Sequence, residues 1–127
     1  MTAEERQQLA ATRRKKAEQS YAVAEEILKD YPLFAVNRYY YALFYAVGAV
    51  LILLDVSVKT HKGTINAFNR ELVSTGKLGR EEGRLLAKVF LWRTQGDYDD
   101  DRAFTVEEVR EISQPVRKLM DRLNQLA

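Results

Sequence analysis

The sequence predicts an all-α protein, a single up-and-down antiparallel bundle of about five helices that covers residues 1–127. Two observations support this fold class. Apolar residues recur three or four positions apart along most of the chain, a spacing that places them on one face of a helix. Strand-like alternation is absent, and no repeat or Gly/Ser/Pro-rich linker divides the 127 residues, so we expect one domain.

The first predicted helix begins at Thr2 and ends before Pro32. Thr2 and Glu5 have the spacing of a capping box, in which each side chain accepts a hydrogen bond from the backbone of the other residue. Pro32 disfavours the helical conformation in the residue before it. The first twenty positions are rich in charged residues, which argues against a secretory signal, and we expect a cytoplasmic location.

The second predicted helix, about Leu33–Leu54, contains the longest uncharged stretch, sixteen residues from Tyr39 to Leu54. A membrane span needs roughly 20 apolar residues, so this stretch is too short. We expect instead a helix that is buried on all sides, against the bundle core and against a second subunit.

Three further helices are predicted. Thr60 can cap the third, and Gly76 can end it. The fourth covers about Gly79–Gln95 and is expected to end at Gly96. The fifth follows a second capping box at positions 105–108.

Short connections make consecutive helices antiparallel neighbours, and this topology predicts which polar residues meet. The end of the second helix, the start of the third and the end of the fourth should share one pole. The residues expected near that pole are Lys59, His61, Lys62, Arg93, Asp97 and Tyr98. Arg38 should lie roughly 24 Å from the end of its helix, at about 1.5 Å per residue.

Composition excludes several kinds of chemistry. The chain has no cysteine and one histidine, which excludes disulfides, thiolate metal sites and a zinc site with several imidazoles from one copy. The acidic segment 97–101 lacks the glycine and distal glutamate of a calcium loop and is better placed to complement a helix N-terminus. We therefore expect no metal and no cofactor.

Charge is concentrated in the middle of the sequence. The net charge is only +2, but residues 55–94 contain eight Lys/Arg and four Asp/Glu. This basic middle is compatible with a phosphate-bearing ligand, for which Arg93 offers a planar pair of donors. The alternative is that these charges are solvated helix faces. His61 is either a capping or packing residue or a proton-transfer group.

Arg38 is the only charge between Pro32 and Leu54. It needs a partner, either a carboxylate inside the chain or a ligand. Asn37 and Tyr40 are assigned with it to internal polar or subunit-interface positions, because three consecutive tyrosines cannot all face the same way on a helix.

Three motifs in this order resemble the HEPN family (higher eukaryotes and prokaryotes nucleotide-binding domain). They are Asn37-Arg38-Tyr39-Tyr40-Tyr41-Ala42-Leu43-Phe44, Lys59-Thr60-His61-Lys62-Gly63 and Arg93-Thr94-Gln95-Gly96-Asp97-Tyr98. The resemblance implies a small helical bundle, commonly a homodimer, that is often encoded beside a minimal nucleotidyltransferase as a toxin–antitoxin pair. Many members are metal-independent ribonucleases.

Active members of that family carry an arginine that is followed, after four to six residues, by a histidine. Counted from Arg93, those positions hold Tyr98, Asp99 and Asp100, which are poorly tuned for proton transfer near neutral pH. The sequence therefore favours a non-enzymatic or weakly active protein that binds nucleotide or RNA phosphate around Arg93. One alternative is a ribonuclease in which His61 supplies the imidazole, and another is a helical adaptor that binds only protein.

Overall fold

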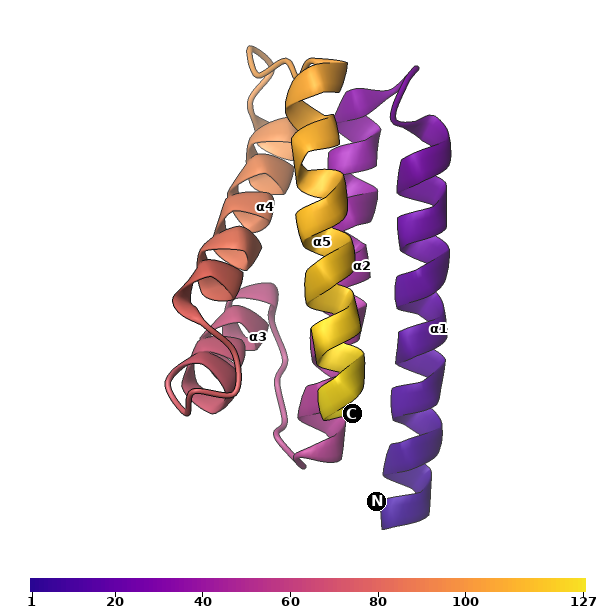
Figure 1. The fold of residues 1–127 in the computed structure, drawn as a ribbon, viewed down its shortest axis with the longest axis vertical. Coiled ribbons are helices and arrows are strands. Elements are labelled where there is room, and N and C mark those ends of the chain that lie inside the picture. Colours follow the sequence, from indigo (N-terminus) through magenta and orange to yellow (C-terminus); the bar gives the residue numbers. More distant parts are fainter.

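The computed structural model describes residues 1–127 and contains five α-helices and one π-helical turn, but no strand. The elements are α1 (Ala3–Ile27), α2 (Pro32–Leu53), α3 (His61–Phe68), η1 (Asn69–Val73), α4 (Arg80–Tyr98) and α5 (Val106–Leu126). The four long helices run along the long axis of the molecule, and α3 is a short helix at one side (Figure 1). The predicted all-α bundle is confirmed.

The helix starts follow the predicted caps in part. Thr2 and Glu5 form the complete capping box, with bonds of 3.0 Å and 3.1 Å between side chain and backbone. At α5, the Thr105 hydroxyl accepts the Glu108 N–H at 3.1 Å. The Glu108 carboxylate does not return the bond, because it pairs with Arg102 at 3.2 Å. The second predicted box is therefore only half formed.

Helix α2 lies at the centre of the bundle and packs against α1, α3, α4 and α5. Eleven of its residues are buried, over somewhat more than half of its circumference, and the opposite face, with Arg38, Tyr41 and Gly48, is only half-buried. By length and composition it is the one helix that could cross a membrane, and 56% of its most apolar window is buried inside the protein. One side of this helix thus forms the bundle core, as predicted, but a single chain does not bury the helix on all sides, and the second subunit expected on the other side stays a prediction.

The predicted arrangement of helix ends is wrong because of the connector 54–60. Asp55 has a φ of +58°, a left-handed conformation that is uncommon outside glycine and that turns the chain back at the end of α2. Val56 and Val58 then pack against the core, so the connector runs back along the bundle, and α3 begins part-way up it (Figure 1). As a result, α4 ends at the pole opposite to the predicted one.

The contacts of Gly96 confirm where α4 ends. A Cβ at this position would lie 3.6 Å from the Leu33 side chain, at the start of α2, and 3.5 Å from Phe104. The glycine therefore permits close packing and does not end the helix, which continues to Tyr98. Gly76 does adopt the left-handed conformation expected of a terminating glycine, with a φ of +81°.

Candidate functional site

Tyr40 and His61 lie at the centre of the candidate site. Tyr40 is fully buried on α2, and its hydroxyl lies 2.7 Å from Nδ1 of His61. His61 is the first residue of α3, where Thr60 caps the helix by accepting the Gly63 N–H at 2.8 Å. The imidazole also packs 4.6 Å from the ring of Phe44, measured between centroids. Tyr40 thus occupies an internal polar position and not the surface of the chain.

The surroundings of His61 favour its neutral form. Partial burial lowers the pKa of the imidazole below its ordinary 6.5, and the positive charge of Arg93 lowers it further. The ring is therefore neutral near pH 7. The histidine and the arginine share one environment, because both contact the rings of Tyr40 and Tyr41, although 32 positions separate them in the sequence.

Arg93 reaches this environment from α4. Its Cζ lies 5.5 Å from the ring centroid of Tyr40 and 5.7 Å from that of Tyr41, within the range of a cation–π contact. Its Nε forms an ion pair with Asp97 at 3.0 Å, one helical turn away. This Nε is buried, but the alignment is too poor for a directional hydrogen bond. The guanidinium is held mainly by aromatic faces, and 16% of the side chain remains exposed.

Arg38 shares the Tyr41 ring with Arg93, and of its two expected partners the carboxylate is wrong. It has no carboxylate partner, because its Nε and Nη2 donate to the Asn37 side-chain oxygen at 3.1 Å and 2.8 Å. Its Cζ lies 5.0 Å from the Tyr41 ring, the same ring that Arg93 contacts. The predicted separation from the site is wrong because the last turns of α4 pack on the first half of α2.

The remaining predicted residues are more exposed. Lys59 lines a small cavity together with His61, whereas Lys62 is an exposed residue of α3 that forms no ion pair. Tyr98, with 80% of its surface exposed, ends α4. In the acidic segment, Asp101 donates its backbone N–H to the Asp99 carboxylate at 3.0 Å. No three His, Asp or Glu side chains are grouped so that they could hold a metal ion.

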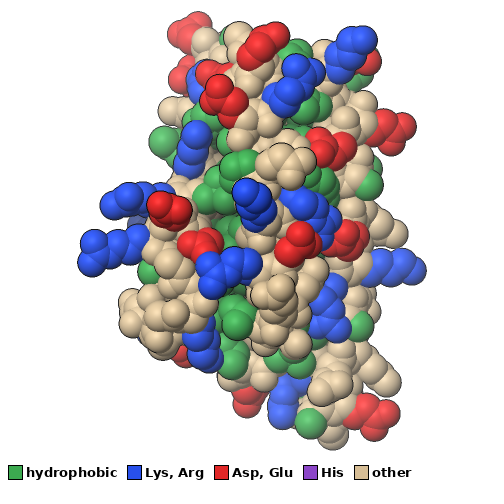
Figure 2. All heavy atoms as spheres, viewed as in Figure 1, with side chains coloured by type: hydrophobic (Ala, Val, Ile, Leu, Met, Phe, Trp, Pro, Cys, Tyr) green, Lys and Arg blue, Asp and Glu red, His purple; other side chains and the backbone are tan.

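The face that carries α5 has a different charge pattern. Basic and acidic side chains are interspersed over it (Figure 2). Arg117 pairs with Glu18 and Asp121, and Arg122 pairs with Glu82. Such exposed pairs are ordinary surface electrostatics. The cations near His61, by contrast, include several without a carboxylate partner.

Sequence reasoning missed Tyr41, whose half-buried ring joins the two arginines. A signal was present, because residues three apart on a helix are neighbours and Tyr41 follows Arg38 at that spacing. We call Arg38, Tyr40, Tyr41, His61 and Arg93 the aromatic–cationic cluster. It combines a neutral imidazole with two guanidinium groups on one aromatic support.

The fold and this cluster define a small helical bundle with a cationic polar site between α2, α3 and α4. The HEPN domain family matches residues 10–126 of the chain. The protein therefore belongs to the HEPN domain family, as the motifs predict.

Curated relatives agree with this assignment. A UPF0332 protein of Thermotoga maritima is 38% identical over 114 residues, which cover 89% of this chain and 86% of the relative. A UPF0332 protein of Gloeobacter violaceus is 44% identical over 85 residues, or 65% of this chain and 67% of the relative. A Methanocaldococcus jannaschii protein named as a candidate toxin is 32% identical over 102 residues, or 79% of this chain and 75% of its own.

Proposed function

We propose that this HEPN protein binds the phosphate of a nucleotide or RNA at the aromatic–cationic cluster and acts as the toxin-type member of a pair with a minimal nucleotidyltransferase. The observation that carries the binding proposal is the convergence of Arg38 and Arg93 on the Tyr41 ring, next to His61, with a carboxylate partner for only one of the two arginines. Arginine binds phosphate oxygens through paired N–H donors, and tyrosine rings offer faces on which a base can stack.

The binding test is Arg93→Gln, measured by fluorescence anisotropy with a labelled single-stranded RNA. A charge-assisted hydrogen bond contributes about 1.5–3 kcal/mol, so the affinity should fall by about 10-fold or more. Affinity of the unaltered protein should also fall as salt is raised. The matched control is Arg110→Gln, which removes the same charge from an exposed position of α5. Equal losses in the two variants would contradict a site at Arg93.

The toxin-type role rests on family membership and on the relatives that are named as candidate toxins. Induced expression of the protein alone should slow bacterial growth, and co-expression of a nucleotidyltransferase encoded beside it should restore growth. The proposal includes a homodimer. Light scattering of the purified protein gives its molar mass and therefore its oligomeric state. A monomer at working concentration would remove the dimer from the proposal.

A ribonuclease is the second candidate, and the Tyr40–His61 bond favours it. When the Nδ1–H of His61 donates to the Tyr40 hydroxyl, 2.7 Å away, Nε2 keeps its lone pair and can accept a proton. In that reaction His61 takes the proton of the RNA 2′-hydroxyl, and Arg93 stabilises the charge that develops on the phosphate. His61→Ala should abolish cleavage of mixed RNA in the presence of a chelator. Unchanged cleavage by this variant would exclude the histidine mechanism.

A further inference from the structure

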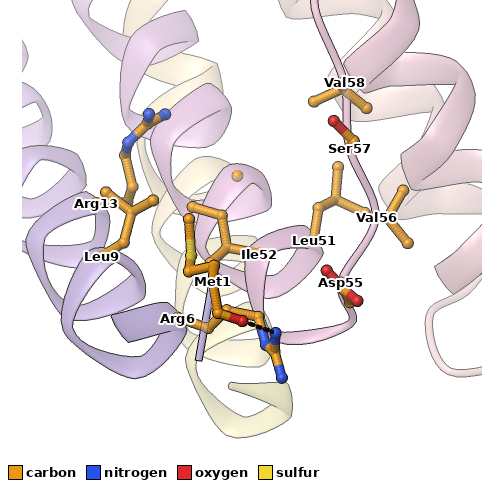
Figure 3. A pocket seen from close by; sticks show the side chains of 11 residues that line it. Met1, Arg6, Leu9, Arg13, Leu51, Ile52, Asp55, Val56, Ser57 and Val58 are labelled. Carbon is orange, nitrogen blue, oxygen red and sulfur yellow. Dashed lines mark hydrogen bonds between the residues drawn. The ribbon is translucent and has the colours of Figure 1, made fainter. Parts of the chain in front are cut away.

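A groove continues from the aromatic–cationic cluster toward the N-terminus of the chain. It consists of two adjoining cavities, of about 160 Å³ and about 230 Å³, that share Arg13, Gly48 and Val58. α1, α2 and the connector 54–60 form its walls (Figure 3). The smaller cavity is lined by His61, so the groove opens directly beside the imidazole.

The half of the groove next to His61 is polar and cationic. Arg13 is half-buried there and forms neither an ion pair nor a hydrogen bond through its side chain, and Lys59 is exposed and equally free of a carboxylate. Figure 3 shows the Arg13 guanidinium extending away from Met1, toward the level of Val58. The one acidic residue of the groove, Asp55, lines only the larger cavity. Two unpaired cations on different walls of the groove, one on α1 and one on the connector, favour an anionic occupant.

Gly48 keeps this groove open. Glycine is a poor helix former, yet this one lies inside the longest apolar helix of the chain. A Cβ at this position would meet one side-chain atom, Arg13 Nη1, at 3.8 Å. Beside Gly48 there is thus only the Arg13 guanidinium and open cavity. A larger side chain at this position would fill the junction of the two cavities.

We propose that Arg13 and Lys59 form a second phosphate subsite and that the ligand is a single-stranded polynucleotide that crosses His61. This inference rests on the proposed phosphate binding at Arg93 and names the kind of ligand. His61 connects the two cationic sites, because it belongs to the aromatic–cationic cluster and also lines the smaller cavity. Proteins that bind single strands use a positive groove along the backbone together with aromatic faces for the bases. Two phosphates of one strand would occupy the two sites.

The test is the dependence of affinity on ligand length. Uridine monophosphate and single-stranded oligouridylates of increasing length are titrated into the protein, and the affinity of the unaltered protein should rise with length. Arg13→Gln should bind the monophosphate as before but lose about 10-fold in affinity for the longer oligonucleotides, the effect of one charge-assisted contact. Arg110→Gln on α5 is the matched control and should retain the full dependence on length.

Gly48 provides a variant that leaves every charge in place. Gly48→Leu should remove the dependence on length because it fills the groove, whereas Gly48→Ala should retain it, since its Cβ makes only an ordinary contact. If Arg13→Gln binds all lengths like the unaltered protein while Arg93→Gln does not, the second subsite is wrong and the proposed function stands. If the unaltered protein binds no ligand of any length, both proposals fail.

Discussion

Two neighbouring tyrosines of α2 build two polar regions with opposite properties. Successive residues of a helix are turned by about 100°, so Tyr39 faces α1 and α5 while Tyr40 faces α3 and α4. The Tyr39 hydroxyl donates to the Glu25 carboxylate at 2.5 Å. Tyr21 and Ser113 donate to the same carboxylate at 2.9 Å and 2.7 Å. We call these four residues the Glu25 cluster.

The Glu25 cluster satisfies its own charge, whereas the aromatic–cationic cluster does not. Burial raises the pKa of Glu25, but the hydrogen bonds from Tyr39, Ser113 and Tyr21 outweigh it and hold the pKa below its ordinary value. On the other side of α2, Arg38 has an amide oxygen as its partner, and Nε of Arg93 lacks an aligned acceptor. The comparison teaches that hydrogen bonds within the fold satisfy the first region, whereas the second contains an arginine, Arg38, without a carboxylate partner.

Tyr39→Phe should have the largest effect on stability. It removes a fully buried hydroxyl that donates to a carboxylate, a bond that contributes about 1.5–3 kcal/mol. Urea denaturation should show this loss in the free energy of unfolding, and RNA affinity should be unchanged. A marked loss of RNA affinity in the folded variant would contradict the claim that the Glu25 cluster contributes to stability and not to RNA binding.

Tyr40→Phe should show the reverse pattern. It removes a neutral hydrogen bond to His61, which contributes about 0.5–1.5 kcal/mol, so denaturation should show a smaller loss of stability than Tyr39→Phe. RNA affinity should fall, because the imidazole loses the bond that orients it. The two variants should be measured together. Equal effects on RNA affinity would contradict the proposed difference between the Glu25 cluster and the aromatic–cationic cluster.

The pH dependence of stability should give the smallest effect. The pKa of His61 is lower in the folded protein than its ordinary 6.5, so below neutral pH the unfolded chain binds more protons than the folded one. Stability that is present above about pH 6.5 is therefore lost as the pH falls through that value and toward the folded-state pKa. His61→Asn should lack this component. Denaturation of both proteins at about pH 7.5 and pH 5.5 measures the difference, and parallel losses would show that His61 does not contribute.

The sequence predicts the elements of this fold better than their arrangement. The caps at Thr2 and Thr60 and the left-handed Gly76 are local features, and local hydrogen bonding and sterics determine them. The direction of the connector depends on Asp55, whose left-handed conformation no periodicity indicates. That one turn reverses the expected position of the end of α4, and with it the position of Arg93 relative to the start of α2.

In the candidate site, too, the sequence predicts the residues better than their arrangement. Arg93 and His61 were expected to lie close together, and both contact the rings of Tyr40 and Tyr41, but at a different height in the bundle and for a different topological reason. Tyr41 was not identified, because apolar residues occupy most of the circumference of α2 and its sequence does not show which side each tyrosine faces. In such a helix, the distribution of hydrophobic residues alone does not show which face points to the core. Arg13 was not identified because it is one of many charged residues along α1.

The connector that carries the chain from α2 to α3 also has an evolutionary consequence. Its residues alternate, with Val56 and Val58 anchored in the protein and Ser57 and Lys59 directed to solvent. Mutations at the two outward positions can accumulate without moving the start of α3. Under the proposed function, selection can therefore change the preference for a ligand through Lys59 while the position of the imidazole stays unchanged.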